Sequence, residues 1–314
     1  MANEPEFHKK LGERYTAFED ALDGEVPNDS RQLWHTPTEL FRPHYGEAIA
    51  RYLVTNYKLS NYPLHDLIIY ELGAGNGTLM LNILDYIRDV EPEVYARTKF
   101  KVIEISSALA SLQTSQLTRN ASSRGHAGQV EIINRSIFTW NTYVPAPCYF
   151  LALEVFDNFA HDSIRYDPFT EEPLQCTILI DNNGDFFEFY SKNIDPVTSR
   201  FLRVRHAASS RPFDHPLRVP RFMRRFKSRL PFAANLTVPE YIPTRLMQFF
   251  DILREFFPQH QLLTSDFHAL PDAVKGYNAP VVQTRYKRRV VPVSTPYVSF
   301  EPNDYPRWHI DLLN

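Results

Sequence analysis

The segment that decides the fold is Leu67-Ile-Ile-Tyr-Glu-Leu-Gly-Ala-Gly-Asn-Gly-Thr78, followed by Leu-Met-Leu-Asn-Ile-Leu84. Its first six residues form an almost unbroken apolar run of strand length, and the apolar residues after the glycines have helical spacing. Strand, glycine turn and helix in this order make the first half of a βαβ unit. Three of the chain's ten glycines lie in this turn, so we expect the functional site there.

The same alternation continues along the chain. Apolar runs at Phe100–Ile105, Val130–Ile133 and Cys148–Leu153 predict three more strands, and the residues from about Ser107 to Leu117 have the spacing of a helix. Strands that alternate with helices indicate a mostly parallel sheet with helices on both faces. We therefore predict a Rossmann-like α/β fold.

Other elements are expected on either side of this core. Helical spacing predicts one helix over Pro37–Tyr57 and another over Tyr241–Phe257, and strand-like runs split by turn residues predict a β-hairpin insertion over Ser163–Tyr190. Three further strands would complete the main sheet, at Leu262–Asp266, Val281–Tyr286 and Val290–Val293. These patterns divide the chain into an N-terminal helical extension (1–60), a nucleotide-binding core (61–162), a hairpin-containing basic insertion (163–240) and a segment that completes the sheet (241–314).

Composition excludes several classes of protein. The 314 residues are 43% hydrophobic and 14% aromatic, which gives ample apolar surface for a folded core. No apolar run approaches the roughly 20 residues that a membrane-spanning helix needs. A net charge of −3 argues against a surface built throughout for nucleic acid. The two cysteines, Cys148 and Cys176, are too few for a disulfide framework or a thiolate zinc site, and we expect no metal.

The glycine turn predicts the chemistry of the ligand. Without a Cβ, Gly73, Gly75 and Gly77 let a ligand approach the backbone, and the helix start beyond them offers free N–H groups to an anion. A dinucleotide-binding turn would have its third glycine three residues past Gly75, where this chain has Thr78. A nucleotide without a pyrophosphate fits better, and we predict S-adenosylmethionine.

Each part of that molecule has an expected position. Its amino-acid end would lie along Gly73–Thr78, including Ala74, with the α-carboxylate near the helix start. Glu104, at the end of the next strand, would bind the ribose diol, and Ser136-Ile137, after the third strand, would adjoin the adenine. A glycine turn can also be plain geometry of a doubly wound sheet. The combination of Glu71, the spaced glycines and Glu104 favours donor binding.

Five segments carry a resemblance to a known family. In chain order they are Thr36-Pro-Thr-Glu39 with Tyr45-Gly46, Glu71-Leu-Gly-Ala-Gly-Asn-Gly-Thr-Leu-Met80, Glu104-Ile-Ser106 with Leu109, Gln113 and Leu117, Glu154-Val-Phe-Asp157, and Ser265-Asp266-Phe267. Over roughly residues 30–295 the chain resembles the MidA-like family of class I S-adenosylmethionine-dependent methyltransferases. The resemblance adds Thr36 to the expected donor site.

The resemblance also implies a substrate and a compartment. It implies methylation of arginine in a protein, a link to the assembly of respiratory complex I, and a mitochondrial location. The first residues, MANEPEFHKK, have neither the apolar stretch of a secretory signal nor the acid-poor character of a transit peptide, so a cytoplasmic location stays open.

An arginine acceptor makes particular demands on the site. Its guanidinium stays protonated at neutral pH and is a poor nucleophile, but carboxylates can hold it through two hydrogen bonds. Glu154 and Asp157 follow the fourth strand, at the edge of the sheet where ligands bind in such folds, and Asp266 follows a later strand. We predict that Glu154 and Asp157 bind and deprotonate the acceptor, with Asp266 in support. The alternatives are a helix cap for Asp157 and a solvated strand end for Glu154.

Departures from the family pattern lie on the acceptor side. Leu153 stands where the family has asparagine, Asn158 where it has alanine, and His268 replaces a glycine. The chain beyond Pro296 also lacks a Gly-x-x-Asp-Leu-Thr segment of the family. A second hypothesis is therefore a catalytically degenerate methyltransferase fold that serves as an assembly or interaction factor.

A basic tract gives a third hypothesis. Six basic residues fall between Arg218 and Arg229, with Phe222 and Phe226 among them. Such a segment could form an amphipathic helix that binds RNA or an acidic partner, as in an RNA methyltransferase. The alternative is a solvated helix whose charge is balanced elsewhere.

Overall fold

The computed structural model describes residues 36–105, 119–180, 186–208, 216–217, 219–227, 234–266, 282–286 and 289–293. The predicted helix between Ser107 and Leu117 lies outside these residues. The chain divides into two compact units: Met1–Val155 with Ile252–Asp266, and Phe156–Asp251 with Phe267–Asn314. This division differs from the four expected segments, because the helices before residue 60 share a core with the nucleotide-binding segment.

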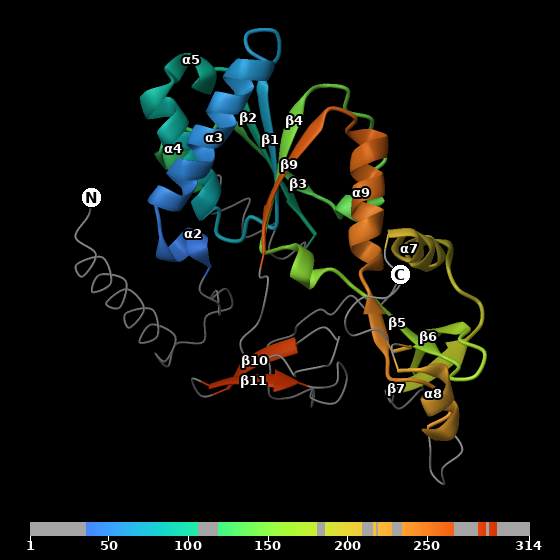
Figure 1. Ribbon diagram of the computed structural model, residues 1–314. Coiled ribbons are helices and arrows are strands. Elements are labelled where there is room, and N and C mark those ends of the chain that lie inside the picture. The colour runs from blue at the N-terminus through green and yellow to red at the C-terminus, as the bar shows by residue number, and fades with distance from the viewer. Residues whose placement is uncertain are drawn as a thin grey trace. The chain divides into compact units, whose positions relative to one another are not determined.

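The first unit is built on a five-stranded sheet (Figure 1). All its neighbouring strands are parallel, in the order β3-β2-β1-β4-β9. The strands are β1 (Leu67–Leu72), β2 (Thr98–Glu104), β3 (Val130–Asn134), β4 (Cys148–Leu153) and β9 (His260–Ser265). Strand order reverses between β1 and β4, and in such sheets the ligand crevice lies beyond the carboxyl ends of the strands at that point. The predicted Rossmann-like α/β fold is confirmed.

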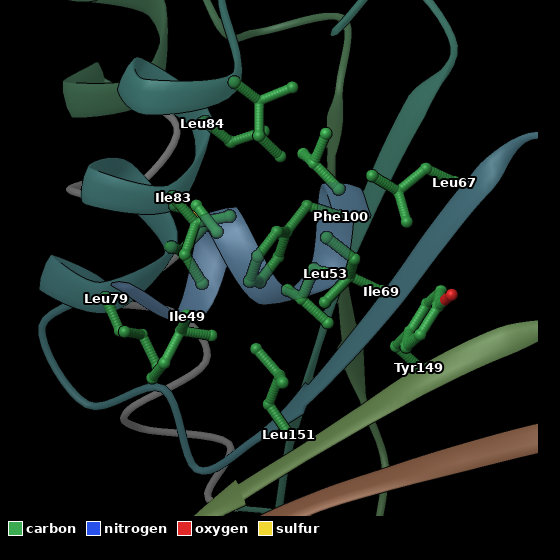
Figure 2. Close-up of a cluster of buried hydrophobic side chains, with 14 of the residues drawn as sticks. Ile49, Leu53, Leu67, Ile69, Leu79, Ile83, Leu84, Phe100, Tyr149 and Leu151 are labelled. Atoms are coloured by element: carbon green, nitrogen blue, oxygen red, sulfur yellow. The ribbon is translucent and has the colours of Figure 1, made fainter. Parts of the chain in front are cut away.

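Two helices cover one face of this sheet. They are α3 (His44–Ser60) and α4 (Thr78–Val90), and a short α5 (Pro92–Tyr95) follows α4. Figure 2 shows Leu53 of α3 and Ile83 of α4 directed at Ile69 and Phe100 of the sheet, and all four side chains are fully buried. One core thus forms between the helices and the sheet. The helices contribute apolar residues at helical spacing, and the strands contribute every second residue.

The predicted helix over Pro37–Tyr57 is in fact two helices. A short α2 (Pro37–Leu40) ends before Pro43, and α3 then continues to Ser60. Proline has no N–H to donate within a helix and disfavours helical geometry in the residue before it, which explains the break. The Thr36 side chain caps α2 by accepting a hydrogen bond from the Glu39 N–H at 3.4 Å.

The opposite face of the sheet is aromatic. Tyr70 of β1 and Phe150 of β4 stack with ring centroids 5.0 Å apart. Trp140, after the short helix η1 (Ile137–Thr139), and Phe257, after α9 (Thr244–Phe256), pack on them. The predicted helix over Tyr241–Phe257 begins later than expected, at Thr244, because Tyr241 pairs in a strand of the second unit.

The second unit contains a four-stranded antiparallel sheet in the order β7-β6-β5-β8. Its strands are β5 (Asp162–Tyr166), β6 (Pro173–Ile180), β7 (Phe186–Ser191) and β8 (Glu240–Ile242). Phe201 and Leu202 of α7 (Pro196–Ala208) pack on its buried core. The predicted hairpin is the β6–β7 pair, and the basic tract contains α8 (Arg221–Lys227).

One expectation for the main sheet is wrong. β10 (Val282–Tyr286) and β11 (Arg289–Val293) pair with each other as a separate antiparallel hairpin instead of completing the main sheet. Only Lys287 and Arg288 separate the two strands, which suits a hairpin, whereas adding parallel strands to a sheet requires a crossover of about a dozen residues. Among the helices that the structure describes, none is both long and apolar enough to cross a bilayer.

Candidate functional site

The site begins at the glycine turn between β1 and α4. Gly75 and Gly77 have φ angles of +52° and +73°, a conformation that residues with a Cβ adopt only at an energetic cost. Gly77 N–H donates to the Ala74 carbonyl at 2.8 Å, which closes the turn and directs the chain into α4. A Cβ placed on Gly75 would meet no atom within 4 Å, so the turn borders open space.

A hollow of about 140 Å³ lies against this turn. Its wall combines the end of β1 and the glycine turn with α2, the first turn of α4 and the end of β4. The residues are Thr36, Pro37, Thr38, Glu39, Tyr45, Glu71, Leu72, Gly73, Ala74, Gly75, Asn76, Thr78, Leu79, Leu153 and Glu154. The hollow therefore lies at the carboxyl ends of β1 and β4, where the strand order reverses.

Glu71 places a buried carboxylate in the wall of this hollow. It shares a strand face with Ile69, and its Oε2 atom has no hydrogen-bond partner among the residues described. Burial raises the pKa of Glu71 from 4.5 to about 8. A buried carboxylate without a partner is costly unless a donor or a cation satisfies it. The hollow is thus suited to a ligand that brings a positive group to Glu71.

Glu154 is held in an unusual backbone conformation. Its φ angle is +55°, and its N–H donates to the Ser265 carbonyl of β9 at 2.8 Å. A non-glycine residue in this region costs of order 1–3 kcal/mol, and such residues cluster at functional sites. Glu154 lines the hollow together with Glu39 and Glu71. Three glutamates from three separate segments of the chain therefore line one space.

α2 lies beside the glycine turn and forms part of the wall of the hollow. The Thr78 hydroxyl donates a hydrogen bond to the Glu39 carboxylate, whose other oxygen accepts from Arg42 Nη1 at 3.2 Å. Tyr45, at the start of α3, also lines the hollow. The early Thr36-Pro-Thr-Glu39 segment is therefore part of the site wall.

Other predicted donor-binding residues lie at the same sheet edge but outside the wall of the hollow. Gly73 N–H donates to the Ile103 carbonyl at 3.2 Å, so the end of β2 adjoins the glycine turn. Glu104 follows Ile103 and is buried. Its carbonyl accepts from the Arg135 N–H at 3.0 Å, which brings the start of the Ser136-Ile137 segment close to it. The Ser136 hydroxyl caps η1 by accepting from the Phe138 N–H at 3.2 Å.

The predicted catalytic residues have different positions. Glu154 lines the hollow. Asp266 belongs to the same unit and follows β9, directly after Ser265, whose carbonyl binds Glu154 N–H. Asp157 is exposed, lies in the short helix η2 (Phe156–Asn158) and belongs to the second unit. It is not among the residues that line the hollow.

Sequence reasoning missed several wall residues. Eight residues that line the hollow were not proposed as site residues: Pro37, Thr38, Glu39, Tyr45, Leu72, Asn76, Leu79 and Leu153. Asn76 and Leu153 are adjacent in sequence to predicted site residues, so both could have been predicted from their position. The contribution of α2 was harder to predict. No periodic pattern in the sequence indicates that α2 packs beside the glycine turn, which lies more than 30 residues further along the chain.

The wall suits S-adenosylmethionine. The first turn of α4 offers backbone N–H groups and the positive end of the helix dipole to a carboxylate, and Glu71 offers a buried, unpartnered oxygen to a cationic group. S-adenosylmethionine carries an α-carboxylate, an ammonium group and a sulfonium. The fold and the site together define a nucleotide-binding α/β protein of the doubly wound class.

Comparison with known proteins identifies the family. Residues 48–300 match the family described as "Putative S-adenosyl-L-methionine-dependent methyltransferase", which spans most of the chain. The chain belongs to this family, and S-adenosyl-L-methionine is the cofactor of the family. The predicted family and the predicted cofactor are confirmed.

Individual relatives add detail. The chain is 29% identical over 272 residues to the "Protein arginine methyltransferase NDUFAF7 homolog, mitochondrial" of Schizosaccharomyces pombe. The match covers 84% of this chain but only 56% of that protein, so the chain spans little more than half the length of this relative.

Solved structures with some likeness come from Burkholderia thailandensis. One is a protein bound to S-adenosyl-homocysteine, with 17% identity, a TM-score of 0.39, and coverage of 52% of this chain and 38% of that one. Another protein of the same superfamily has 16% identity, a TM-score of 0.39, and coverage of 65% and 54%.

Proposed function

We propose that this chain transfers the methyl group of S-adenosylmethionine to an arginine side chain of a protein. The observation that carries the proposal is the position of Glu154. Glu154 lines the same hollow as the glycine turn, its φ angle is in the left-handed region, and its N–H is bonded to β9. The name of the S. pombe relative, a protein arginine methyltransferase, supports the choice of acceptor.

The donor would be bound through its amino-acid end and through its nucleoside end. The first turn of α4 binds its α-carboxylate, and Glu71 binds its ammonium group. Glu104 binds the ribose diol and Ser136-Ile137 adjoins the adenine, since the end of β2 lies beside the glycine turn and the end of β3 lies beside β2. When bound, S-adenosylmethionine supplies a methyl carbon attached to a positively charged sulfur.

The acceptor would approach from the side of β4. Glu154 binds the guanidinium and directs one of its nitrogens toward the methyl carbon, with Asp266 as a supporting negative charge. That nitrogen forms the new N–C bond as the carbon–sulfur bond breaks, and the proton it gives up passes to Glu154. Asp157 stays a candidate second carboxylate for the acceptor.

The biological setting is part of the proposal. The S. pombe relative is named as mitochondrial, which supports a mitochondrial location for this chain. The link to complex I assembly rests on the family resemblance. A degenerate assembly factor and an RNA methyltransferase that uses the basic tract Arg218–Arg229 are the competing functions, and the experiment below separates them.

The test measures donor binding and methyl transfer separately. Glu154→Gln removes the negative charge but keeps the shape of the side chain. We expect its affinity for S-adenosylmethionine to stay within about twofold by calorimetry, and its transfer of labelled methyl to a protein extract to fall at least ~100-fold. Acid hydrolysis of the product should release methylated arginine. The matched control is Glu255→Gln, at an exposed position of α9.

Each alternative has its own result. Donor binding with no transfer by the unmodified chain would indicate an assembly factor. Label in RNA but not in protein would indicate an RNA methyltransferase. Undiminished transfer by Glu154→Gln would remove the role of Glu154.

A further inference from the structure

α8 presents its apolar side chains to solvent. Phe222 and Phe226, one helical turn apart, are 73% and 69% exposed. Met223 lies on the same side of the helix, Val219 lies two residues before its first residue, and both are also exposed. A helix that packs on its own protein normally buries such a stripe. An exposed apolar group of this kind marks an interaction site.

The side of α8 that carries Arg224 faces inward instead. Arg224 is buried, although arginine is among the residues least often found inside a protein. Its Nη1 donates to the Leu217 carbonyl at 2.7 Å and to the Val219 carbonyl, and its Nη2 binds the Glu171 carboxylate. Arg221 adds a hydrogen bond from Nη2 to the Phe169 carbonyl at 3.1 Å. These bonds fix the rotation of the helix, so the apolar stripe has to face outward.

Positive charge accompanies the stripe. At about 100° per residue, positions 225 and 227 fall on the two flanks of the Phe222–Phe226 stripe, and they are an arginine and a lysine in the sequence. Arg218 and Arg229 lie just beyond the ends of the helix along the chain. An apolar stripe between basic flanks is the pattern of a helix that lies in the interface of a membrane with anionic lipids.

We propose that α8 docks on a bilayer that contains anionic phospholipid. The four apolar side chains enter the boundary between headgroups and acyl chains, and the basic residues bind lipid phosphates. RNA would contact the basic residues and stack on the phenylalanine rings, but it would leave Val219 and Met223 without a role. A bilayer would contact all of these side chains, so it is the partner that the surface fits better. This inference is independent of the methyl-transfer chemistry.

Flotation with lipid vesicles tests the proposal. The full chain should float with vesicles of phosphatidylcholine and phosphatidylglycerol, remain unbound with phosphatidylcholine alone, and bind more weakly as salt is raised. The double variant Phe222→Ser/Phe226→Ser should lose at least ~tenfold in vesicle affinity. The far-UV circular dichroism spectrum and the urea unfolding transition should be unchanged, which shows that the variant is folded. The matched control is Phe187→Ser/Phe189→Ser, which removes two exposed aromatic residues of β7 and should bind vesicles normally.

A tryptophan at position 222 reports insertion into the bilayer directly, without a measurement of vesicle affinity. In Phe222→Trp, fluorescence should be that of a water-exposed indole in buffer and should shift to shorter wavelength with anionic vesicles. Three results overturn the proposal: no vesicle binding by the unmodified chain, equal binding by the α8 double variant, or an indole at position 222 that is already shielded in buffer. Binding of a polyuridine strand that requires Phe222 and Phe226, without vesicle binding, would assign the surface to RNA.

Discussion

The hydroxyl of Thr78, in the first turn of α4, donates a hydrogen bond to the carboxylate of Glu39 in α2. The two residues lie 39 positions apart in the chain. Because α2 has only four residues, packing alone holds it weakly, and this bond fastens it beside the glycine turn. The shape of the hollow therefore depends on a contact between the βαβ unit and a helix outside it.

Removing the hydroxyl should loosen this wall. In Thr78→Val we expect about 1 kcal/mol less stability toward urea and a loss of roughly three- to tenfold in affinity for S-adenosylmethionine by calorimetry. Thr55→Val, at an exposed position of α3, is the control and should change neither quantity. If Thr78→Val bound the donor normally, α2 would contribute nothing to the site.

The raised pKa of Glu71 predicts a release of protons on donor binding. With a pKa of about 8, Glu71 is mostly protonated at pH 7, and an ammonium group beside it would favour the ionised form. Calorimetry at pH 7 in buffers of different ionisation enthalpy should show a net release of protons on donor binding. Donor affinity should rise nearly tenfold per pH unit between about pH 5 and 7.

Glu71→Gln should abolish this proton release, whereas Glu39→Gln should retain it. The raised pKa of Glu71 also predicts how the stability of the fold changes with pH. The folded chain holds a proton on Glu71 that the unfolded chain loses near pH 4.5, so this residue lowers stability progressively from about pH 4.5 to 8. Glu71→Gln should then be more stable than the unmodified chain at pH 8, by about 1–4 kcal/mol. Equal stability of the two at pH 8 would contradict the assignment.

A methyl group at Gly75 should occupy the donor space. Gly75→Ala strains a residue with positive φ, at about 1–2 kcal/mol, and adds a Cβ where no protein atom lies within 4 Å. We expect at least ~tenfold weaker donor binding. Gly125→Ala carries the same kind of strain at φ +81° with no atom within 4 Å and lies outside the hollow, so it should lose stability but not affinity. Equal affinity losses in both variants would point to strain alone.

The crossing of α3 and α4 should tolerate no side chain at Gly46. A Cβ there would lie 2.6 Å from the Cβ of Asn82 in α4, far inside van der Waals contact. Gly46→Ala should lower the free energy of unfolding by about 1–3 kcal/mol, measured from the denaturant midpoint. Gly128→Ala, with no neighbour within 4 Å and no positive φ, should change it by less than about 0.5 kcal/mol.

The central part of the fold was predictable because its signals are local. The run Leu67–Leu72 is apolar at every position but one, and the glycine turn follows it directly, so strand, turn and helix could be assigned from adjacent residues. β10 and β11 were misassigned to the main sheet because apolar strand-like runs do not specify their partner. The short separation of the two strands was the better signal.

The candidate site was predictable only in part for the same reason. Glu71 and the glycines are contiguous in sequence, and Glu154 follows a recognisable strand, so all of them could be proposed. Glu39 and Tyr45 reach the hollow through tertiary packing that leaves no periodic signal. The buried, unpartnered oxygen of Glu71 and the positive φ of Glu154 are likewise visible only in three dimensions.

The interruption of the main sheet bears on how the chain folds as it is synthesised. β4 ends at Leu153 and its neighbour β9 begins at His260, with the whole β5–β8 sheet encoded between them. A ribosome therefore releases the complete inserted sheet before the last parallel strand is made. Until then β4 has an open edge that could pair with other chains. The length of the inserted segment therefore sets how long the nascent chain is exposed to aggregation.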